Sequence, residues 1–251
     1  MKSKILATLF TAVLAFSTPA QADETVAIKA GFMLLSASGQ LGAAVNNIGT
    51  NLDLETDLKL GNSTQPTGEL TINLGDTLFS FGIIPINFSG TSSLTRNITY
   101  NGQNYAAGSV VSSELKADIF DVGYTYYLVN MDDLPSRFQL GIESAVKTIS
   151  LKTSLTSAGI TSSKSITIPI PTLGLRGRVA LADFIGLTGR VGYLGYSGNT
   201  FTDIDAQIEF SPLPTLGIYA GYRHLNIKLN SNGIFANTTL AGPYAGGFFR
   251  F

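Results

Sequence analysis

Hydrophobic and polar residues alternate one for one along several stretches of the chain. In the segment 202–211, which reads TDIDAQIEFS, every second residue is apolar and most of the others are polar or charged. The same alternation recurs in the segments 137–150, 174–181 and 185–193. A period of two residues predicts β-strands with one apolar and one polar face.

The spacing of such stretches predicts ten strands joined by connections that alternate in length. We assign the strands to residues 25–38, 67–74, 78–94, 111–129, 137–155, 164–180, 184–197, 202–211, 215–229 and 240–251. Connections such as 39–66 and 95–110 are long and polar, whereas 75–77 and 212–214 are tight. Long extracellular loops and short periplasmic turns are typical of transmembrane barrels. The sequence therefore predicts an all-β fold, an antiparallel transmembrane β-barrel of ten strands, or of eight if residues 67–94 pair differently.

The N-terminus has the pattern of a secretory signal peptide. Lys2 and Lys4 precede an apolar run over residues 5–16, and Ala20 and Ala22 form an A-x-A cleavage site. This pattern predicts export, whereas a membrane-spanning helix would need about 20 apolar residues. We therefore expect residues 1–22 to be a signal peptide and residues 23–251 to form the barrel.

The composition narrows the possible functions. Charged residues make up 13% of the chain, the mean hydropathy is +0.24, and there is no Cys, no Trp and a single His. A formal net charge of −1 gives no basic surface for nucleic acid, and the absence of Cys excludes disulfides and thiolate catalysis. No motif indicates a cofactor. A soluble periplasmic β protein would show similar alternation and remains an alternative.

The C-terminus carries the most specific pattern. Phe249 and Phe251 end an alternating strand, and this ending resembles the signal by which the barrel-assembly machinery recognises outer-membrane barrels. The chain also resembles the proteobacterial outer-membrane proteins with a C-terminal Gly-Gly motif, which are loosely OmpW-like, in the stretches 168–171, 212–214, 221–223 and 242–246. The resemblance implies a multi-pass barrel in the outer membrane of a Gram-negative bacterium, in contact with lipid and lipopolysaccharide. It implies little about activity.

The polar faces predict a narrow or closed lumen. If the connections 156–163, 198–201 and 212–214 are hairpin loops, three pairs of opposite charges face each other across strands: Glu143 with Arg176, Arg190 with Glu209, and Asp203 with Arg223. Further candidates for lumen-facing charges are Lys29, Glu69, Asp121, Arg137, Lys147 and Arg178. Such side chains would fill much of the interior of a barrel this small.

Other features carry weaker predictions. The insertion 39–66 contains four leucines, which we interpret as a surface loop that shields its own apolar residues, with a lid or plug as the alternative. His224 has the parity of an outward-facing residue and is predicted to lie at the outer rim rather than in a catalytic site. The segment 168–171, with two prolines, predicts an irregular stretch or a bulge. The acidic clusters lack the geometry of a metal site.

We therefore predict a barrel without enzymatic activity. It would be a narrow, porin-like channel or a binding protein for small solutes, or else a structural barrel. The alternative is an outer-leaflet lipid-modifying enzyme or a surface adhesin built on the extended rim. No catalytic residue and no metal ligand is assigned.

Overall fold

The computed structural model describes residues 26–46, 48–131, 137–231 and 233–251. The predicted signal peptide lies outside these residues. The strands are β1 (Val26–Ala43), β2 (Leu52–Asp53), β3 (Ser63–Leu74), β4 (Thr77–Ser93), β5 (Ile98–Tyr100), β6 (Gln103–Tyr105), β7 (Val110–Asn130), β8 (Phe138–Ser157), β9 (Ile160–Ala182), β10 (Ile185–Tyr196), β11 (Asn199–Leu213), β12 (Leu216–Ser231) and β13 (Ile234–Arg250). Within the described residues, no helix is long and apolar enough to cross a membrane.

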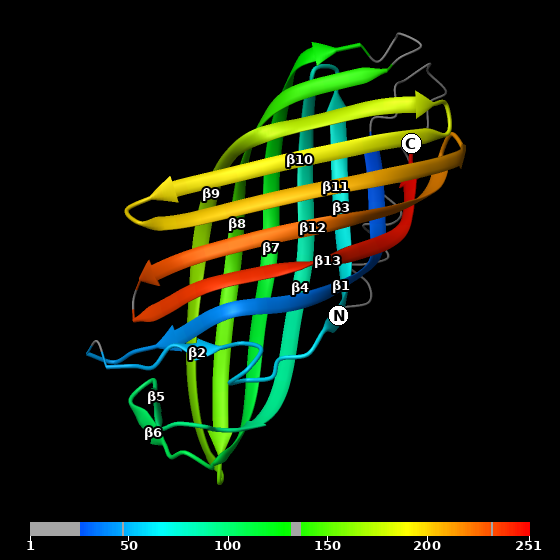
Figure 1. Cartoon of the computed structure of the whole chain (residues 1–251). Helices are drawn as coiled ribbons and strands as arrows, with labels where there is room; N and C mark the ends of the chain where they lie inside the picture. Colours follow the sequence, from blue (N-terminus) through cyan, green and yellow to red (C-terminus); the bar gives the residue numbers. More distant parts are fainter. Residues whose placement is uncertain (1–25, 47, 132–136, 232) are drawn as a thin grey trace, which may run out of the picture.

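Ten of these strands form a closed antiparallel barrel (Figure 1). The wall runs in the order β13-β12-β11-β10-β9-β8-β7-β4-β3-β1, and β13 pairs with β1 to close it. Among the described strands, the two-residue β2 pairs with β1 alone, and β5 and β6 form a separate hairpin. The predicted ten-strand barrel is thus confirmed. The eight-strand alternative is wrong, because β3 and β4 both lie in the wall.

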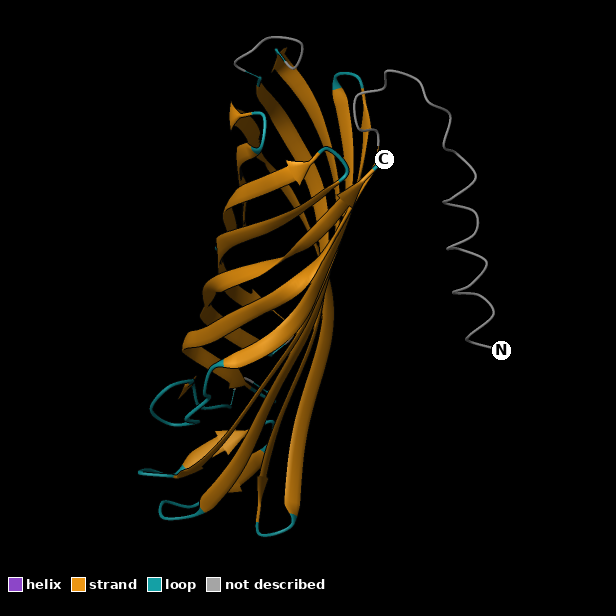
Figure 2. Cartoon of the chain, turned by 90° about the vertical axis from the view of Figure 1, so that its right-hand side faces the viewer, coloured by secondary structure: helices purple, strands orange, loops and turns teal. Residues whose placement is uncertain are grey.

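The two ends of the barrel differ. The end that carries Val26 and Phe251, which we name the turn end, also carries the tight connections β3–β4 and β11–β12. The opposite loop end carries the β1–β3 and β4–β7 connections. The strands β7, β8 and β9 have 21, 20 and 23 residues, whereas β10 has only 12, so one side of the wall extends further at the loop end (Figure 2).

At the loop end, two-residue turns join β8 to β9 and β10 to β11 and set the register of these hairpins. Ala158 and Gly159 between β8 and β9, like Ser197 and Gly198 between β10 and β11, have positive φ angles. This conformation is typical of the tight turn that matches the twist of a hairpin. The predicted loops 156–163 and 198–201 were therefore too long, because the strands continue to these turns.

The wall has an apolar band on its outer face. On β7 the exposed residues Phe120, Val122, Tyr124, Tyr126 and Leu128 alternate with buried ones. Toward the loop end, the outward residues of the same strand become polar. The band on β7 thus covers nine residues from 120 to 128, which is close to the roughly 9–11 residues that a tilted strand needs to cross a membrane.

The insertion 39–66 packs into the loop end of the barrel. Leu52, Leu54 and Leu58 are buried in the same core cluster as Phe88 of β4 and Val111 of β7. The interpretation as a surface loop that shields its own leucines was wrong, because the inner face of the barrel is also apolar at this level and offers a larger surface to bury.

The β5–β6 hairpin packs beside this loop. Tyr105 donates a hydrogen bond to the carbonyl oxygen of Leu155 at 3.0 Å, and the Tyr100 hydroxyl contacts that of Thr153 on β8. Burial raises the pKa of Tyr100 to about 12. Together the insertion and the hairpin cover the inner face of β7 and β8 at the loop end.

Candidate functional site

Inside the barrel, a cluster of buried charges lies at the level of the outer apolar band. We name it the central cluster, and it consists of Asp121, Lys147, Arg190, Asp203 and Arg223. Arg223 binds Asp203 through two hydrogen bonds, from Nε at 2.9 Å and from a terminal nitrogen at 2.7 Å. Lys147 contacts Asp121 and also lies 2.9 Å from a carboxylate oxygen of Asp203, while its side chain is 1% exposed. Each buried charge thus has an opposite charge beside it, which burial requires.

The central cluster spans the barrel. Arg223 on β12 lies 3.6 Å from Asp121 on β7, and four strands separate β12 from β7 in either direction around the wall. An ion pair between opposite walls leaves little open space between them. The lumen is therefore filled by side chains at this level.

Two smaller groups of ion pairs lie nearer the turn end. Glu209 contacts Lys29 at 2.7 Å and Arg178 at 3.6 Å, and it also binds Arg250. Arg176 lies 3.3 Å from Glu143 on the neighbouring strand and 3.4 Å from Glu69 on β3.

The structure corrects the predicted cross-strand pairs. Arg190 lies opposite Asp205, and Glu209 lies opposite Gly186, so the predicted Arg190–Glu209 pair was wrong. The tight turn at residues 197–198 shifts the register of β10 against β11 by an even number of residues, so each side chain stays on its predicted face. Arg190 still points inward and reaches Asp121 and Asp203 instead of Glu209.

The other two predicted pairs form ion pairs without lying directly opposite. Arg176 faces Gly141 and Arg223 faces Asp205 across the strands. Their side chains reach Glu143 and Asp203 diagonally, over a distance that long side chains can span.

Most of the remaining candidates lie inside the barrel. Lys29, Asp121 and Lys147 are buried, and Glu69 and Arg178 are partly buried. Arg137, by contrast, is exposed just before β8 and lies outside these groups, because the strand begins one residue later.

Sequence reasoning missed four members of the network, which are Asp205, Gln207, Tyr244 and Arg250. The Tyr244 hydroxyl donates to Asp205 at 2.8 Å, and the Gln207 amide donates to Glu209 at 2.7 Å. All four have the inward parity of their strands, so the alternation contained the information needed to find them.

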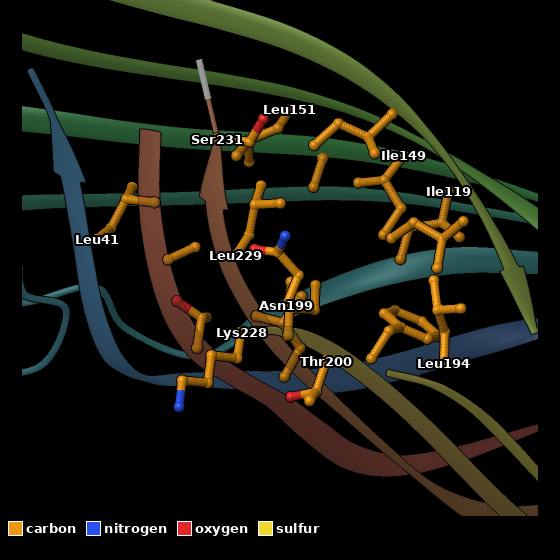
Figure 3. A pocket seen from close by; sticks show the side chains of 18 of the residues that line it. Leu41, Ile119, Ile149, Leu151, Leu194, Asn199, Thr200, Lys228, Leu229 and Ser231 are labelled. Atoms are coloured by element: carbon orange, nitrogen blue, oxygen red, sulfur yellow. The ribbon is translucent and has the colours of Figure 1, made fainter. Parts of the chain in front are cut away.

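Between the central cluster and the loop end, the barrel interior contains an apolar cavity of about 250 Å³. Most of its lining is aliphatic and includes Ala117, Ile119, Ile149, Ile168, Leu194 and Ala236. Figure 3 shows Ile119, Ile149 and Leu194 gathered on one side, with Leu41 and Leu229 on another. The lining also includes the polar residues Asn199 and Ser231 and the exposed Lys228.

The cavity was not predicted, because the polar face of each strand was taken to point inward along its whole length. On β8 the buried inward residues change from Glu143 and Lys147 to Ile149, while the outward residue Ser150 is polar and exposed. The alternation keeps its period of two, but near residue 148 the apolar residues change from the outer face of the strand to the inner face. That exchange is the signal in the sequence that could have located the cavity.

His224 lies on the outer side of β12. His224 lies opposite Ile204 and Ala241 on an outward-parity position, half-buried, as its parity predicts. Among the described residues, no group of three or more His, Cys, Asp or Glu could hold a metal ion.

Comparison with known proteins identifies the fold. No protein-family model and no curated protein matches the sequence. The outer-membrane protease OmpT of Escherichia coli has a similar structure, with a TM-score of 0.63 and 12% identity, covering 94% of this chain and 99% of that one. Two other structures are less similar. The translocator domain of the autotransporter NalP from Neisseria meningitidis has a TM-score of 0.45 and 13% identity, covering 100% of this chain and 96% of that one. Ail of Yersinia pestis has a TM-score of 0.42 and 11% identity, covering 91% of this chain and 100% of that one. The loose OmpW-like resemblance stays a prediction, and the chain has the closed barrel fold of an outer-membrane protein.

Proposed function

We propose that this protein is an integral outer-membrane barrel that binds a small apolar molecule in the cavity at its loop end. The observation that carries the proposal is a largely aliphatic cavity of about 250 Å³ next to a barrel interior filled by ion pairs. The outer apolar band supports the membrane location, since a soluble protein rarely exposes so much contiguous apolar surface. In this orientation the loop end faces outward and the turn end faces the periplasm.

The size and lining of the cavity suggest the class of ligand. An aliphatic cavity of about 150 Å³ stays dry and accepts benzene, so 250 Å³ corresponds to about ten heavy atoms by proportion. Two fused aromatic rings or a short alkyl chain have this size. The polar groups of Asn199 and Ser231 match one polar group on such a molecule.

Binding is favoured over passage along the barrel axis. A solute that moved from the loop end to the turn end would have to displace the central cluster, whose charges are paired and buried. Breaking a buried ion pair costs about 3–5 kcal/mol. The role proposed here needs no catalytic residue.

The C-terminus fits this proposal as the assembly signal. Phe249 and Phe251 are both exposed on the outer face, where the barrel-assembly machinery and then lipid would contact them.

A single tryptophan in the cavity would test the proposal. The chain contains no Trp, so Phe201→Trp, at a 2% exposed position in the lining, creates a unique reporter. With the barrel refolded in lipid vesicles, we expect 1-bromonaphthalene, a two-ring heavy-atom quencher, to quench this Trp saturably.

The matched variants separate cavity binding from quenching by the lipid phase. Ala117→Leu combined with Ala236→Leu fills the cavity, and we expect the apparent affinity to fall at least tenfold. Ala245→Leu makes a single Ala-to-Leu change on the exposed outer face and should leave the affinity unchanged. The proposal would be contradicted if quenching rose linearly with the 1-bromonaphthalene concentration and was equal in the filled and control variants.

A further inference from the structure

We infer that the ligand enters the cavity sideways, from the apolar layer of the membrane, where the barrel wall parts between β9 and β10. This inference rests on the proposed function, because it supplies the same cavity with the same class of molecule.

The strand pairing shows where the wall parts. The ladder between β9 and β10 ends at the pair Leu173–Tyr193. Toward the loop end, β9 continues from residue 172 back to Ile160, and this segment pairs with β8 alone among the described strands. Beyond Tyr193, β10 pairs with β11 as far as Tyr196. Figure 1 shows the β10–β11 hairpin crossing away from the long lower part of β9.

Two prolines lie on the unpaired segment of β9. Pro169 and Pro171 face Thr148 and Val146 of β8 in an uninterrupted register. The sequence prediction of an irregular stretch or bulge was therefore wrong. Proline has no N–H to donate and is confined to strand edges, so both residues fit a segment whose second edge has no strand partner.

A glycine pair fixes the point at which the strands part. Gly174 faces Gly192, one position from the last pair of the ladder. A Cβ atom at Gly174 would lie 1.7 Å from the carbonyl oxygen of Val191, so only glycine allows the two backbones to approach this closely. The wall is tightly closed there and open immediately beyond it.

The parting leads directly into the cavity. Ile168, Pro169 and Ile170 on β9 line the cavity from one side of the parting, and Leu194 and Tyr196 on β10 line it from the other. The residues on either side of the parting are thus cavity residues.

The outer surface at the parting is apolar. Leu173, Leu175 and Tyr193 are 65%, 48% and 53% exposed on the outer face, so the apolar band reaches the last closed pair. Tyr196, at the edge of the parting, is 76% exposed, and aromatic side chains of this kind favour the border between lipid and water. A molecule dissolved in the outer part of the bilayer would therefore reach the cavity without crossing water.

The route through the loop end is less direct. The insertion with Leu52 and Leu58 and the β5–β6 hairpin with Tyr100 pack against β7 and β8 on that side. These groups would have to move before a ligand could enter from the water above β7 and β8.

A covalent bridge across the parting tests the route. The chain has no Cys, so Pro171→Cys with Gly195→Cys creates a unique outward-facing pair on either side of the parting. The three atoms nearest to a Cβ at Gly195 would all belong to the flexible side chain of Tyr193. A short bismaleimide then joins the two strands in a background that carries the Phe201→Trp reporter.

The matched control is Leu175→Cys with Val191→Cys, which the same reagent joins across a pair that is already closed. After rapid mixing with vesicles that contain 1-bromonaphthalene, we expect quenching to slow at least tenfold when the parting is bridged. The control bridge should change the rate less than twofold, and both bridged proteins should reach the same final quenching.

Two results would overturn the inference and are distinguishable. If the bridge across the parting leaves the rate within twofold of the unbridged protein, the ligand enters from the loop end and the cavity still binds it. If the unbridged reporter shows no saturable quenching, the proposed function fails, and the route fails with it.

Discussion

Replacement of Arg223 with Met should destabilise the barrel by about 3 kcal/mol. Arg223 donates two hydrogen bonds to Asp203, at 2.9 and 2.7 Å, and both side chains are almost completely buried. Removing one member of a buried ion pair costs about 3–5 kcal/mol, because the other charge stays buried. We take the lower end of that range because Lys147 remains 2.9 Å from Asp203.

An exposed pair of the same length provides the control. Lys116 Nζ lies 2.7 Å from a carboxylate oxygen of Glu114, but these side chains are 47% and 39% exposed. Exposed ion pairs contribute about 0–1 kcal/mol, so Lys116→Met should change the stability by less than 1 kcal/mol. Arg223→Lys keeps the charge but loses the two-pronged geometry, and it should fall between the two Met variants.

The assay is equilibrium unfolding in urea of the barrel refolded in phosphatidylcholine vesicles. The folded fraction is followed by the heat-dependent shift of gel mobility and by circular dichroism. If Arg223→Met lowers the free energy of unfolding no more than Lys116→Met, burial does not govern the strength of these pairs. The description of the central cluster as a closed, paired network would then be wrong.

Three further predictions concern other parts of the barrel. In planar bilayers the refolded protein should be silent, and discrete conductance steps would contradict a lumen filled by the central cluster. In the same urea assay, Gly246→Ala should destabilise the barrel by about 1–3 kcal/mol, because the new Cβ would lie 2.2 Å from the carbonyl oxygen of Ala30. The control Gly247→Ala should cost less than about 1 kcal/mol, because the nearest atom to its new Cβ would be 3.6 Å away. Burial raises the pKa of Tyr100 to about 12, whereas an unfolded tyrosine has a pKa near 10. The neutral Tyr100 therefore contributes to stability below pH 10, and this contribution is lost as the pH rises toward 12. Tyr100→Phe should therefore reduce the loss of unfolding free energy measured between pH 10 and 12.

The sequence predicted the architecture well because a barrel wall repeats one simple rule. Every strand must present one face to the interior and one to the outside, so a period of two residues reveals both the strands and their parity. The inward placement of Asp203, Glu209 and Arg223 follows from that parity alone. A shift of register by an even number of residues preserves it, so this placement does not depend on the exact hairpin turns.

The pairing of the charges could not be predicted from the same pattern. The predicted pairs came from neighbouring strands, whereas the central cluster joins Arg223 to Asp121 on the opposite wall. Contacts across a lumen depend on the diameter of the barrel and the tilt of its strands, which no local sequence pattern contains.

By itself, the sequence determined the all-β barrel, the parity of the wall residues and the charges available for the interior. The tertiary structure alone decided where those charges meet, where the interior becomes apolar, and where the wall opens. Alternation is a local property of the backbone, so the sequence records it directly. The cavity and the parting of β9 from β10 arise because strands of 23 and 12 residues meet in one wall, and this mismatch exists only once the barrel has closed.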